Sequence, residues 1–336
     1  MKNKYYFFLI LFFTWTAFAA AQVELTRFAG RGKVGTTGFQ FLKIGPSARA
    51  VGMGESFIAL ANDVSAMYYN PAGLTQLKER GAIFSLTQWP ADINYGFVGT
   101  AIPTRLFGTI GAFVGALSTG DMKKTVLYKG WTGEYFSATD WLAGLSYARG
   151  LTDRFAIGGN VKMVSEFLDN ESVTTWAVDF GTMFNIGIRG IKFSMMITNF
   201  GPNVKFINEE FSLPTTFKFG VVGEAFSWND NRMIITVEGA HPNDNVEQVA
   251  MGTEYTFKNI LALRAGYRGF IMLEDKDKQV QIDAKRSVAV EEPMAGLSFG
   301  VGFNVPIAGM KTKLDYAYAD MGFLQNAQRL TLTLNF

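Results

Sequence analysis

The chain has no cysteine and only one histidine in 336 residues. Disulfides and thiolate metal sites are therefore excluded, and a single histidine leaves neither a Ser-His-Asp arrangement nor a zinc site to propose. Charge is also scarce, since Asp, Glu, Lys and Arg make up 18% of the residues and the formal net charge is +2. We expect no nucleic-acid partner, no metal, no cofactor and no enzymatic activity.

Long apolar runs are absent after the first residues. Lys2 and Lys4 precede an apolar stretch at residues 5–13, and small residues lead up to Ala21. This pattern is typical of a secretory signal peptide, so residues 1–21 are predicted to be cleaved on export. No later run reaches the 18 or more apolar residues that a spanning helix needs. The sequence therefore predicts an exported protein without membrane-spanning helices.

Aromatic residues and glycine are abundant instead. Aromatics make up 15% of the chain, with 31 Phe, and there are 36 Gly. In lipid, only a closed barrel satisfies all backbone polar groups without helices. We therefore predict an all-β fold, a 14-stranded antiparallel transmembrane β-barrel at residues 82–336, surrounded by the lipid of a bacterial outer membrane.

The strand count comes from segments in which apolar and polar residues alternate between turn residues. An even count lets a single-chain barrel close antiparallel. The predicted strands are 82–89, 93–103, 107–118, 137–149, 154–167, 173–187, 191–200, 214–226, 231–240, 247–257, 260–271, 294–305, 311–320 and 327–336.

The last strand carries the clearest alternation. Leu330, Leu332, Leu334 and Phe336 alternate with polar residues on a strand long enough to cross a tilted path through hydrocarbon. An aromatic last residue resembles the C-terminal signal that the outer-membrane assembly machinery recognises. The alternative is an edge strand of a soluble β-sandwich.

Connection lengths test the strand order independently. Connections after even-numbered strands are all tight, whereas the longest ones, 119–136, 201–213 and 272–293, all follow odd-numbered strands. Such barrels have short periplasmic turns and longer outer loops. The three long connections are therefore predicted to lie on the outer side.

The segment ahead of the barrel, residues 22–81, lacks strands of this length. We predict an N-terminal periplasmic hatch inside the barrel, and a soluble periplasmic extension is the alternative. Arg49 and Asp63 would pair with charges of the lumen wall in a hatch, or remain solvated on a surface.

Three short motifs in this segment carry a resemblance to a known family. They are Ser47-Ala48-Arg49, Gly52-Met53-Gly54, and Asn70-Pro71-Ala72-Gly73, the last following Asp63. With them the chain resembles the PorV/PorQ family of outer-membrane proteins, associated with type IX secretion and part of the FadL-like barrel superfamily. Beside the resemblance, Gly52 and Gly54 suit close backbone approach, and Asn70 with Pro71 suits a turn.

The resemblance implies a plugged barrel that binds translocon or cargo proteins of type IX secretion through its outer loops. Trp131, Phe206 and Phe211 are the predicted loop contacts, because exposed aromatics are enriched at binding hot spots; the alternative is that they pack the loops onto the barrel mouth. The competing hypothesis is a FadL-like passive transporter of a hydrophobic ligand such as a fatty acid, and a purely structural barrel is a third. Gly108, Gly111 and Gly115 would allow a kink that opens the transporter wall, or close packing against the hatch.

Overall fold

The structure is a computed structural model that describes residues 35–336 apart from 105, 271–295 and 308. The predicted signal peptide (1–21), the start of the predicted hatch (22–34) and the predicted outer loop 272–293 lie outside the described residues. No helix in the described part is long and apolar enough to cross a membrane.

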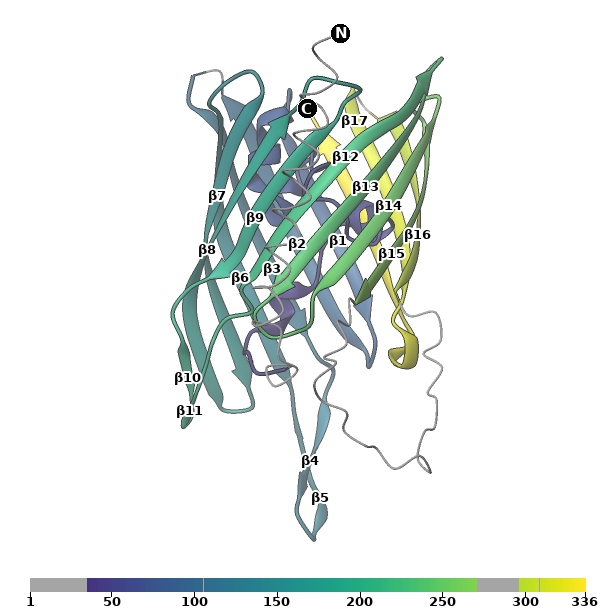
Figure 1. The fold of residues 1–336 in the computed structure, drawn as a ribbon. Helices are drawn as coiled ribbons and strands as arrows, with labels where there is room; N and C mark the ends of the chain where they lie inside the picture. The colour runs from purple at the N-terminus through teal and green to yellow at the C-terminus, as the bar shows by residue number, and fades with distance from the viewer. Residues whose placement is uncertain (1–34, 105, 271–295, 308) are drawn as a thin grey trace, which may run out of the picture.

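Fourteen strands form one closed antiparallel barrel in the described chain (Figure 1). Every strand predicted from the alternation is present, and no boundary is displaced by more than three residues. The barrel strands are β1 (Gly81–Trp89), β2 (Ile93–Thr104), β3 (Gly108–Ser118), β6 (Ala138–Gly150), β7 (Phe155–Leu168), β8 (Glu171–Asn185), β9 (Lys192–Phe200), β12 (Thr216–Trp228), β13 (Asn231–Pro242), β14 (Gln248–Phe257), β15 (Leu261–Phe270), β16 (Leu297–Ile307), β17 (Met310–Asp320) and β18 (Asn326–Asn335).

The first and last strands close the barrel. β1 pairs with β18 along nearly its whole length, and the backbone N–H of Phe336 donates to the carbonyl of Arg80 at 2.9 Å. Along β18, Leu330 is exposed on the outer surface, whereas Arg329 and Thr331 are buried on the inner face. The predicted alternation is therefore confirmed, and the edge-strand alternative is wrong because β18 has a partner on each side.

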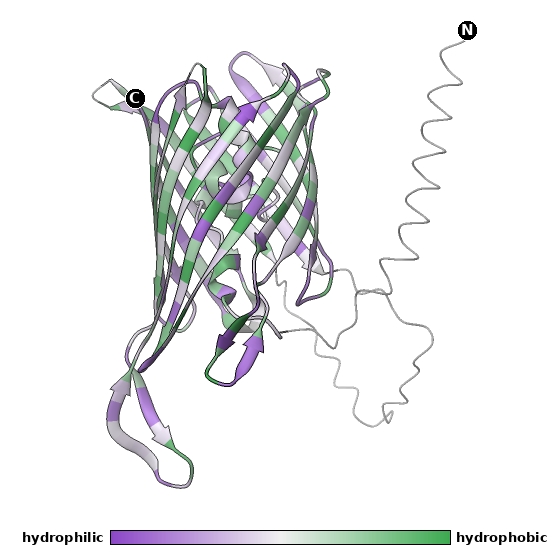
Figure 2. Cartoon of the chain, turned by 90° about the vertical axis from the view of Figure 1, so that its left-hand side faces the viewer, coloured by the Kyte–Doolittle hydropathy of each residue, from purple (hydrophilic) through white to green (hydrophobic). Residues whose placement is uncertain are grey.

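The outer surface is apolar on all sides. Tyr147, Trp176 and Phe180, for example, are all exposed there, and Figure 2 shows hydrophobic positions along the outward strands between the two rims. A sheet closed on itself leaves no unpaired edge, which makes an apolar outer surface compatible with hydrocarbon. The barrel therefore has the arrangement of a membrane-spanning protein.

The two ends of the barrel differ, as the connection lengths predicted. At one end, here named the turn end, the strands join through tight connections, and Phe336 lies there. The β12–β13 connection, for example, is Asn229 and Asp230, both with positive φ (47° and 63°), which suits the twist of a two-residue hairpin. The other end, named the loop end, carries the longer connections.

Two of the long connections at the loop end contain strands of their own, which the sequence pattern did not predict. Residues 119–136 include the hairpin of β4 (Met122–Val126) and β5 (Gly130–Phe136), which projects well beyond the barrel (Figure 1). Residues 201–213 include the shorter hairpin of β10 (Val204–Phe206) and β11 (Glu209–Phe211). The loop end is therefore taller on the side of β6 to β9.

Residues 35–80, named the lumenal segment, lie inside the barrel (Figure 1). The segment starts at the loop end, where Gly35 N–H donates to the carbonyl of Asp244 at 3.2 Å, and it ends at Arg80, directly before β1. Its short helices are η2 (Gln40–Lys43), α2 (Ala48–Val51), α3 (Ala66–Tyr69) and η3 (Pro71–Gln76). Side chains such as Phe57 and Met67 are fully buried between the segment and the inner wall.

The glycines of β3 do not mark a kink. β3 pairs with β2 and with β6 without a register shift, so the predicted weak point in this strand is wrong. A Cβ at Gly111 would lie 2.6 Å from Sδ of Met67, and one at Gly115 would lie 2.7 Å from the hydroxyl of Tyr95. These glycines provide room for inward side chains and for the lumenal segment, which is the packing alternative.

An irregular pairing occurs elsewhere, between β8 and β9. The register shifts between Val178 and Phe180, and Asn199 has a φ of 57°. Asp179 accepts the backbone N–H of Asn199 at 2.7 Å, and Lys162 contacts both of their side chains. A bulge in the wall is thus stabilised by a buried polar cluster.

Candidate binding cavity

The Ser47-Ala48-Arg49 motif lies in the lumenal segment and anchors it to the wall. The Ser47 hydroxyl caps α2 by accepting from Ala50 N–H, and Arg49 follows in the same turn. Nε and Nη2 of Arg49 donate to the two carboxylate oxygens of Glu254 on β14 at 2.8 and 2.7 Å. Nη1 donates to Asp63 at 2.7 Å. Arg49 therefore joins two parts of the lumenal segment to the barrel.

The ion-pair network continues along the wall. Arg264 on β15 donates to Glu254 and to Asp315 on β17, both at 2.7 Å. Burial disfavours ionisation of Asp63, but Arg49, with smaller contributions from Lys313 and Ser65, outweighs burial and holds the pKa of Asp63 below its ordinary value. Both predicted residues, Arg49 and Asp63, are thus buried and paired rather than solvated on a surface.

The Gly52-Met53-Gly54 motif is the point of closest approach between segment and wall. Gly54 has a φ of 68°, and a Cβ there would lie 2.8 Å from the backbone nitrogen of Tyr267. On the wall, a Cβ at Gly266 would lie 2.0 Å from the nitrogen of Gly54. Met53 is fully buried. Glycine on both surfaces is therefore what permits backbone-to-backbone contact here.

The Asn70-Pro71-Ala72-Gly73 motif forms the start of η3. Asn70 is fully buried; its Nδ2 donates to the carbonyls of Ile58 and Thr182, and its Oδ1 accepts from Ala72 N–H at 3.1 Å. Pro71 occupies the first turn, where its missing N–H costs nothing. Ala72 and Gly73 are buried behind it. The motif lies toward the turn end, and none of its residues lines the cavity described below.

At the loop end the segment is held by one carboxylate. Asp244, in the β13–β14 connection, accepts from Thr37, Gln40 and Lys43 at 2.5 to 2.8 Å. Burial alone would raise the pKa of Asp244, but these three donors lower it below its ordinary value. Of the predicted site residues none lies in this anchor, because its members come from two distant parts of the chain, residues 37–43 and Asp244.

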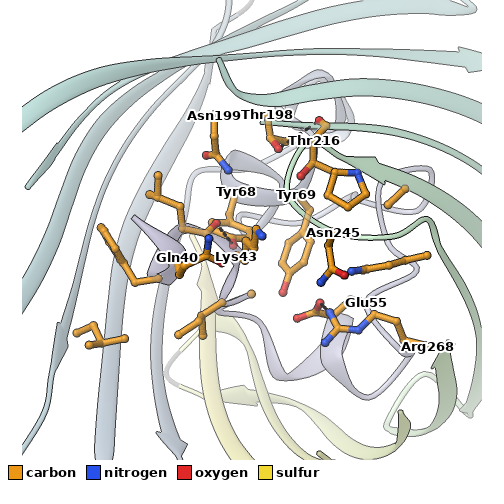
Figure 3. A pocket seen from close by; sticks show the side chains of 18 of the residues that line it. Gln40, Lys43, Glu55, Tyr68, Tyr69, Thr198, Asn199, Thr216, Asn245 and Arg268 are labelled. Carbon is orange, nitrogen blue, oxygen red and sulfur yellow. Dashed lines mark hydrogen bonds and ion pairs between the residues drawn. The ribbon is translucent and has the colours of Figure 1, made fainter. Parts of the chain in front are cut away.

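A cavity of about 630 Å³ lies at the loop end, between the lumenal segment and the barrel wall. Its floor includes η2 and the phenol rings of Tyr68 and Tyr69, as Figure 3 shows. Its apolar lining is Phe41, Leu42, Ile44, Trp89, Ile93, Leu117, Ala240, Pro242, Met321 and Leu324. The volume falls within the range of small-molecule sites.

The charged residues that line the cavity are mostly engaged with one another or with neighbours. Arg268 pairs with Glu55. Burial alone would raise the pKa of Glu55, but Arg268, Arg329 and Lys218 hold that pKa below its ordinary value. Figure 3 shows this pair at one side of the cavity. The site is thus an apolar cavity in which most charged groups are paired with one another or with neighbours.

None of the three predicted loop contacts lines the cavity. Trp131 on β5 is exposed, with its ring 5.9 Å from that of Tyr135 and beneath the ammonium of Lys123. Phe206 is half-buried on β10, and Phe211 on β11 lies beside Gly38 of the lumenal segment. Trp131 is thus exposed on the projecting hairpin, whereas Phe211 lies beside the start of the lumenal segment.

The sequence pattern did not predict the cavity at the loop end. Its wall is made of inward residues at the loop-end termini of the strands, such as Trp89 and Leu117, which sit in the correct phase of the alternation. That phase could have identified them as lumen-facing. Nothing in the pattern indicated how deeply the lumenal segment fills the barrel, and therefore where space remains.

No protein-family model and no curated protein matches the chain. Among solved structures, the toluene transporter TbuX of Ralstonia pickettii superposes with a TM-score of 0.58 at 12% identity, covering 88% of this chain and 98% of the other. The toluene transporter TodX of Pseudomonas putida gives 0.56 at 11% identity, with 86% and 96% covered. The CymD monoaromatic hydrocarbon channel gives 0.54 at 11% identity, with 87% and 98% covered. At such identities the likeness shows a shared fold over most of the chain.

Proposed function

We propose that the chain is an outer-membrane barrel that binds hydrophobic or amphipathic small molecules in its loop-end cavity and passes them across the membrane without catalysis. The observation that carries the proposal is the cavity itself, lined by apolar side chains and bounded below by the lumenal segment. A largely apolar pocket with a few polar groups is the usual form of a small-molecule site.

The shared fold supports this choice of cargo. TbuX and TodX are toluene transporters, and CymD is a monoaromatic hydrocarbon channel. If this chain carries a similar small apolar molecule, its barrel needs an apolar binding site. The cavity provides one. The transporter hypothesis is therefore favoured over the secretion role that the PorV/PorQ resemblance implies. None of the three similar structures named above is a secretion protein.

The route beyond the cavity is part of the proposal. The lumenal segment blocks a straight path, because its core side chains are fully buried against the wall. Thr198 and Asn199 line the cavity and also lie at the β8–β9 bulge. We assign the exit to this interrupted part of the wall, in place of the glycines of β3.

The proposal is tested by filling the cavity. Leu117→Trp enlarges an inward side chain of the cavity wall, and Val114→Trp, on the same strand, enlarges a side chain exposed on the outer surface. With purified protein in lipid nanodiscs, saturable binding of toluene or octanol should be lost in the first variant and kept in the second. Equal binding by both variants would contradict the cavity as the site.

A second function, protein docking in type IX secretion, is favoured by one feature. The β4–β5 hairpin projects from the loop end and carries Trp131 and Tyr128, both exposed. Exposed aromatics of this kind are enriched at protein-binding hot spots. Pull-down from native membranes with the intact chain and with Trp131→Ala tests it: a very large barrel or secreted C-terminal domains captured by the first and lost from the second would support docking.

A further inference from the structure

The charges that line the cavity do not all have partners. Five of the six charged residues of the lining belong to ion pairs: Lys43 with Asp244, Lys162 with Asp179, Lys218 with Glu238, and Arg268 with Glu55, which is itself a lining residue. The side chain of Asp140, the remaining charged residue of the lining, forms no ion pair and no hydrogen bond with any described residue. The cavity therefore presents one uncompensated charge, and it is negative.

A second carboxylate reinforces this charge. Asp140 on β6 is paired in register with Glu166 on β7, and both side chains are on the inward phase of their strands. Glu166 is not itself part of the lining; it accepts the backbone N–H of Phe39, and no described lysine or arginine forms an ion pair with it. Like charges directly opposite one another on neighbouring strands are destabilising. A cation placed between or beside them would remove that repulsion.

The surroundings of the two carboxylates are apolar. Leu117 on β3 is paired in register with Asp140 and is buried. Trp89 and Ile93, on the next two strands, and Phe41 of the lumenal segment also line the cavity. A ligand that satisfied Asp140 would therefore lay the rest of its surface against aliphatic and aromatic side chains.

We infer that the cavity selects amphipathic molecules with a cationic head, an alkyl- or arylammonium, whose head binds at Asp140, next to Glu166 on the neighbouring strand, and whose apolar body lies along Leu117, Trp89 and Phe41. An anionic head would have to displace Glu55, Glu238 or Asp244 from its cation. A bare metal ion would leave the apolar lining unused. The inference rests on the proposed function and names the ligand class of the same site.

The test compares three ligands of equal chain length: octylamine, octanol and octanoate. Binding to the full-length protein in nanodiscs is measured by calorimetry against empty nanodiscs. Octylamine should bind at least about tenfold more tightly than the other two, as expected for one charge-assisted hydrogen bond to a carboxylate. In Asp140→Asn this preference should disappear while octanol binds as before. Glu171→Gln, which changes an exposed carboxylate at the β7–β8 tip, should bind like the unaltered protein.

The outcomes separate the two proposals. Octanoate or octanol binding as tightly as octylamine would overturn the cationic preference and leave the transporter proposal standing, whereas no binding of any of the three would overturn both. Calcium binding that depends on Asp140, without an amine preference, would assign the carboxylates to a metal and overturn the inference. If Asp140→Asn does not fold into a heat-resistant barrel, Glu166→Gln and Asp140→Glu serve instead: the first should weaken the preference and the second should retain it.

Discussion

At the scale of single residues, Arg49 decides how the lumenal segment is held. Its guanidinium joins α2 to Asp63 within the segment and to Glu254 on the wall, and all three side chains are at least nine-tenths buried. A planar group with five donors suits this bidentate contact better than an ammonium. A buried pair of this kind matters less for its net energy than for what removing one partner leaves behind.

Arg49→Met keeps an unbranched side chain, although a shorter one, and removes its charge. Glu254 would retain Arg264, but Asp63 would lose its closest cation, so we expect unfolding to become easier by about 3 kcal/mol. The measurement is urea unfolding of protein refolded in lipid vesicles, followed by tryptophan fluorescence. Lys311→Met is the control, because its pair with Glu79 is exposed and should contribute at most about 1 kcal/mol. Equal losses in the two variants would contradict the assigned role.

Asp244 makes the loop-end anchor sensitive to acid. Its folded pKa lies below its ordinary value, so the stabilisation is complete above the unfolded pKa of about 3.9 and is lost as the pH falls through the folded pKa. Pepsin, which is active in acid, should therefore begin to cleave at Phe39 to Leu42 only when the pH falls below about 4. Asp244→Asn cannot form the ion pair with Lys43 and should be cleaved throughout the acid range. A cleavage profile shared by both proteins would contradict the anchor.

At the scale of elements, the contacts between the lumenal segment and the wall depend on glycine facing glycine. Gly54 approaches Gly266 on β15, and Gly52 approaches Gly300 on β16, at distances that leave no room for a Cβ. The neighbouring atoms are backbone, which cannot rotate away as a flexible side chain can. The segment and these two strands therefore fit as rigid surfaces.

Gly266→Ala should accordingly cost about 1–3 kcal/mol, since the added methyl group can be relieved only by moving backbone. The matched control is Gly96→Ala on β2, an outward position where the nearest heavy atom, Cδ2 of Leu86, is 3.9 Å from the new Cβ. Its effect should stay within about 0.5 kcal/mol. The temperature at which each barrel loses its compact mobility on gel electrophoresis ranks them. A control that falls as far as Gly266→Ala would show that the loss reflects strand glycines in general.

The strands were predictable from the sequence because alternation with period two is a local signal. Residues such as Leu330 and Arg329 report their own faces, and tight connections such as Asn229–Asp230 report the turns. The β4–β5 hairpin was missed because it lies outside lipid, where no face has to be apolar. Arg49 and Asp63 were recognised as candidates for pairing, but Glu254 was not, since its partner is distant in sequence.

At the scale of the whole molecule, the barrel is closed by the pairing of its first and last strands, β1 and β18. β1 follows directly on the lumenal segment, and β18 ends the chain with Phe336 exposed on the outer surface. The side chain of Phe336 makes little contribution to the folded barrel from such a position. A role of Phe336 in recognition during assembly therefore stays a prediction, made from its resemblance to the assembly signal.

Phe336→Ala should lower the amount of barrel in the outer membrane several-fold in cells, while refolding of the purified chain into lipid vesicles stays nearly unchanged. The contrast between the two measurements separates recognition from stability. Phe303→Ala, which removes another exposed outward ring, on β16, should leave both unchanged. If both variants lose the same amount in cells, the terminal ring has no special part in assembly.

The path of the lumenal segment constrains the order of biogenesis. The lumenal segment starts at the loop end beside Asp244 and ends at the turn end with Arg80. It therefore runs through the whole length of a barrel whose wall is closed. Once folded, with its buried short helices and the ion pairs of Arg49, the lumenal segment is too bulky to be drawn into the closed barrel. We therefore expect β1 and β18 to pair around a lumenal segment that is already in place, as a late step in the assembly of the barrel.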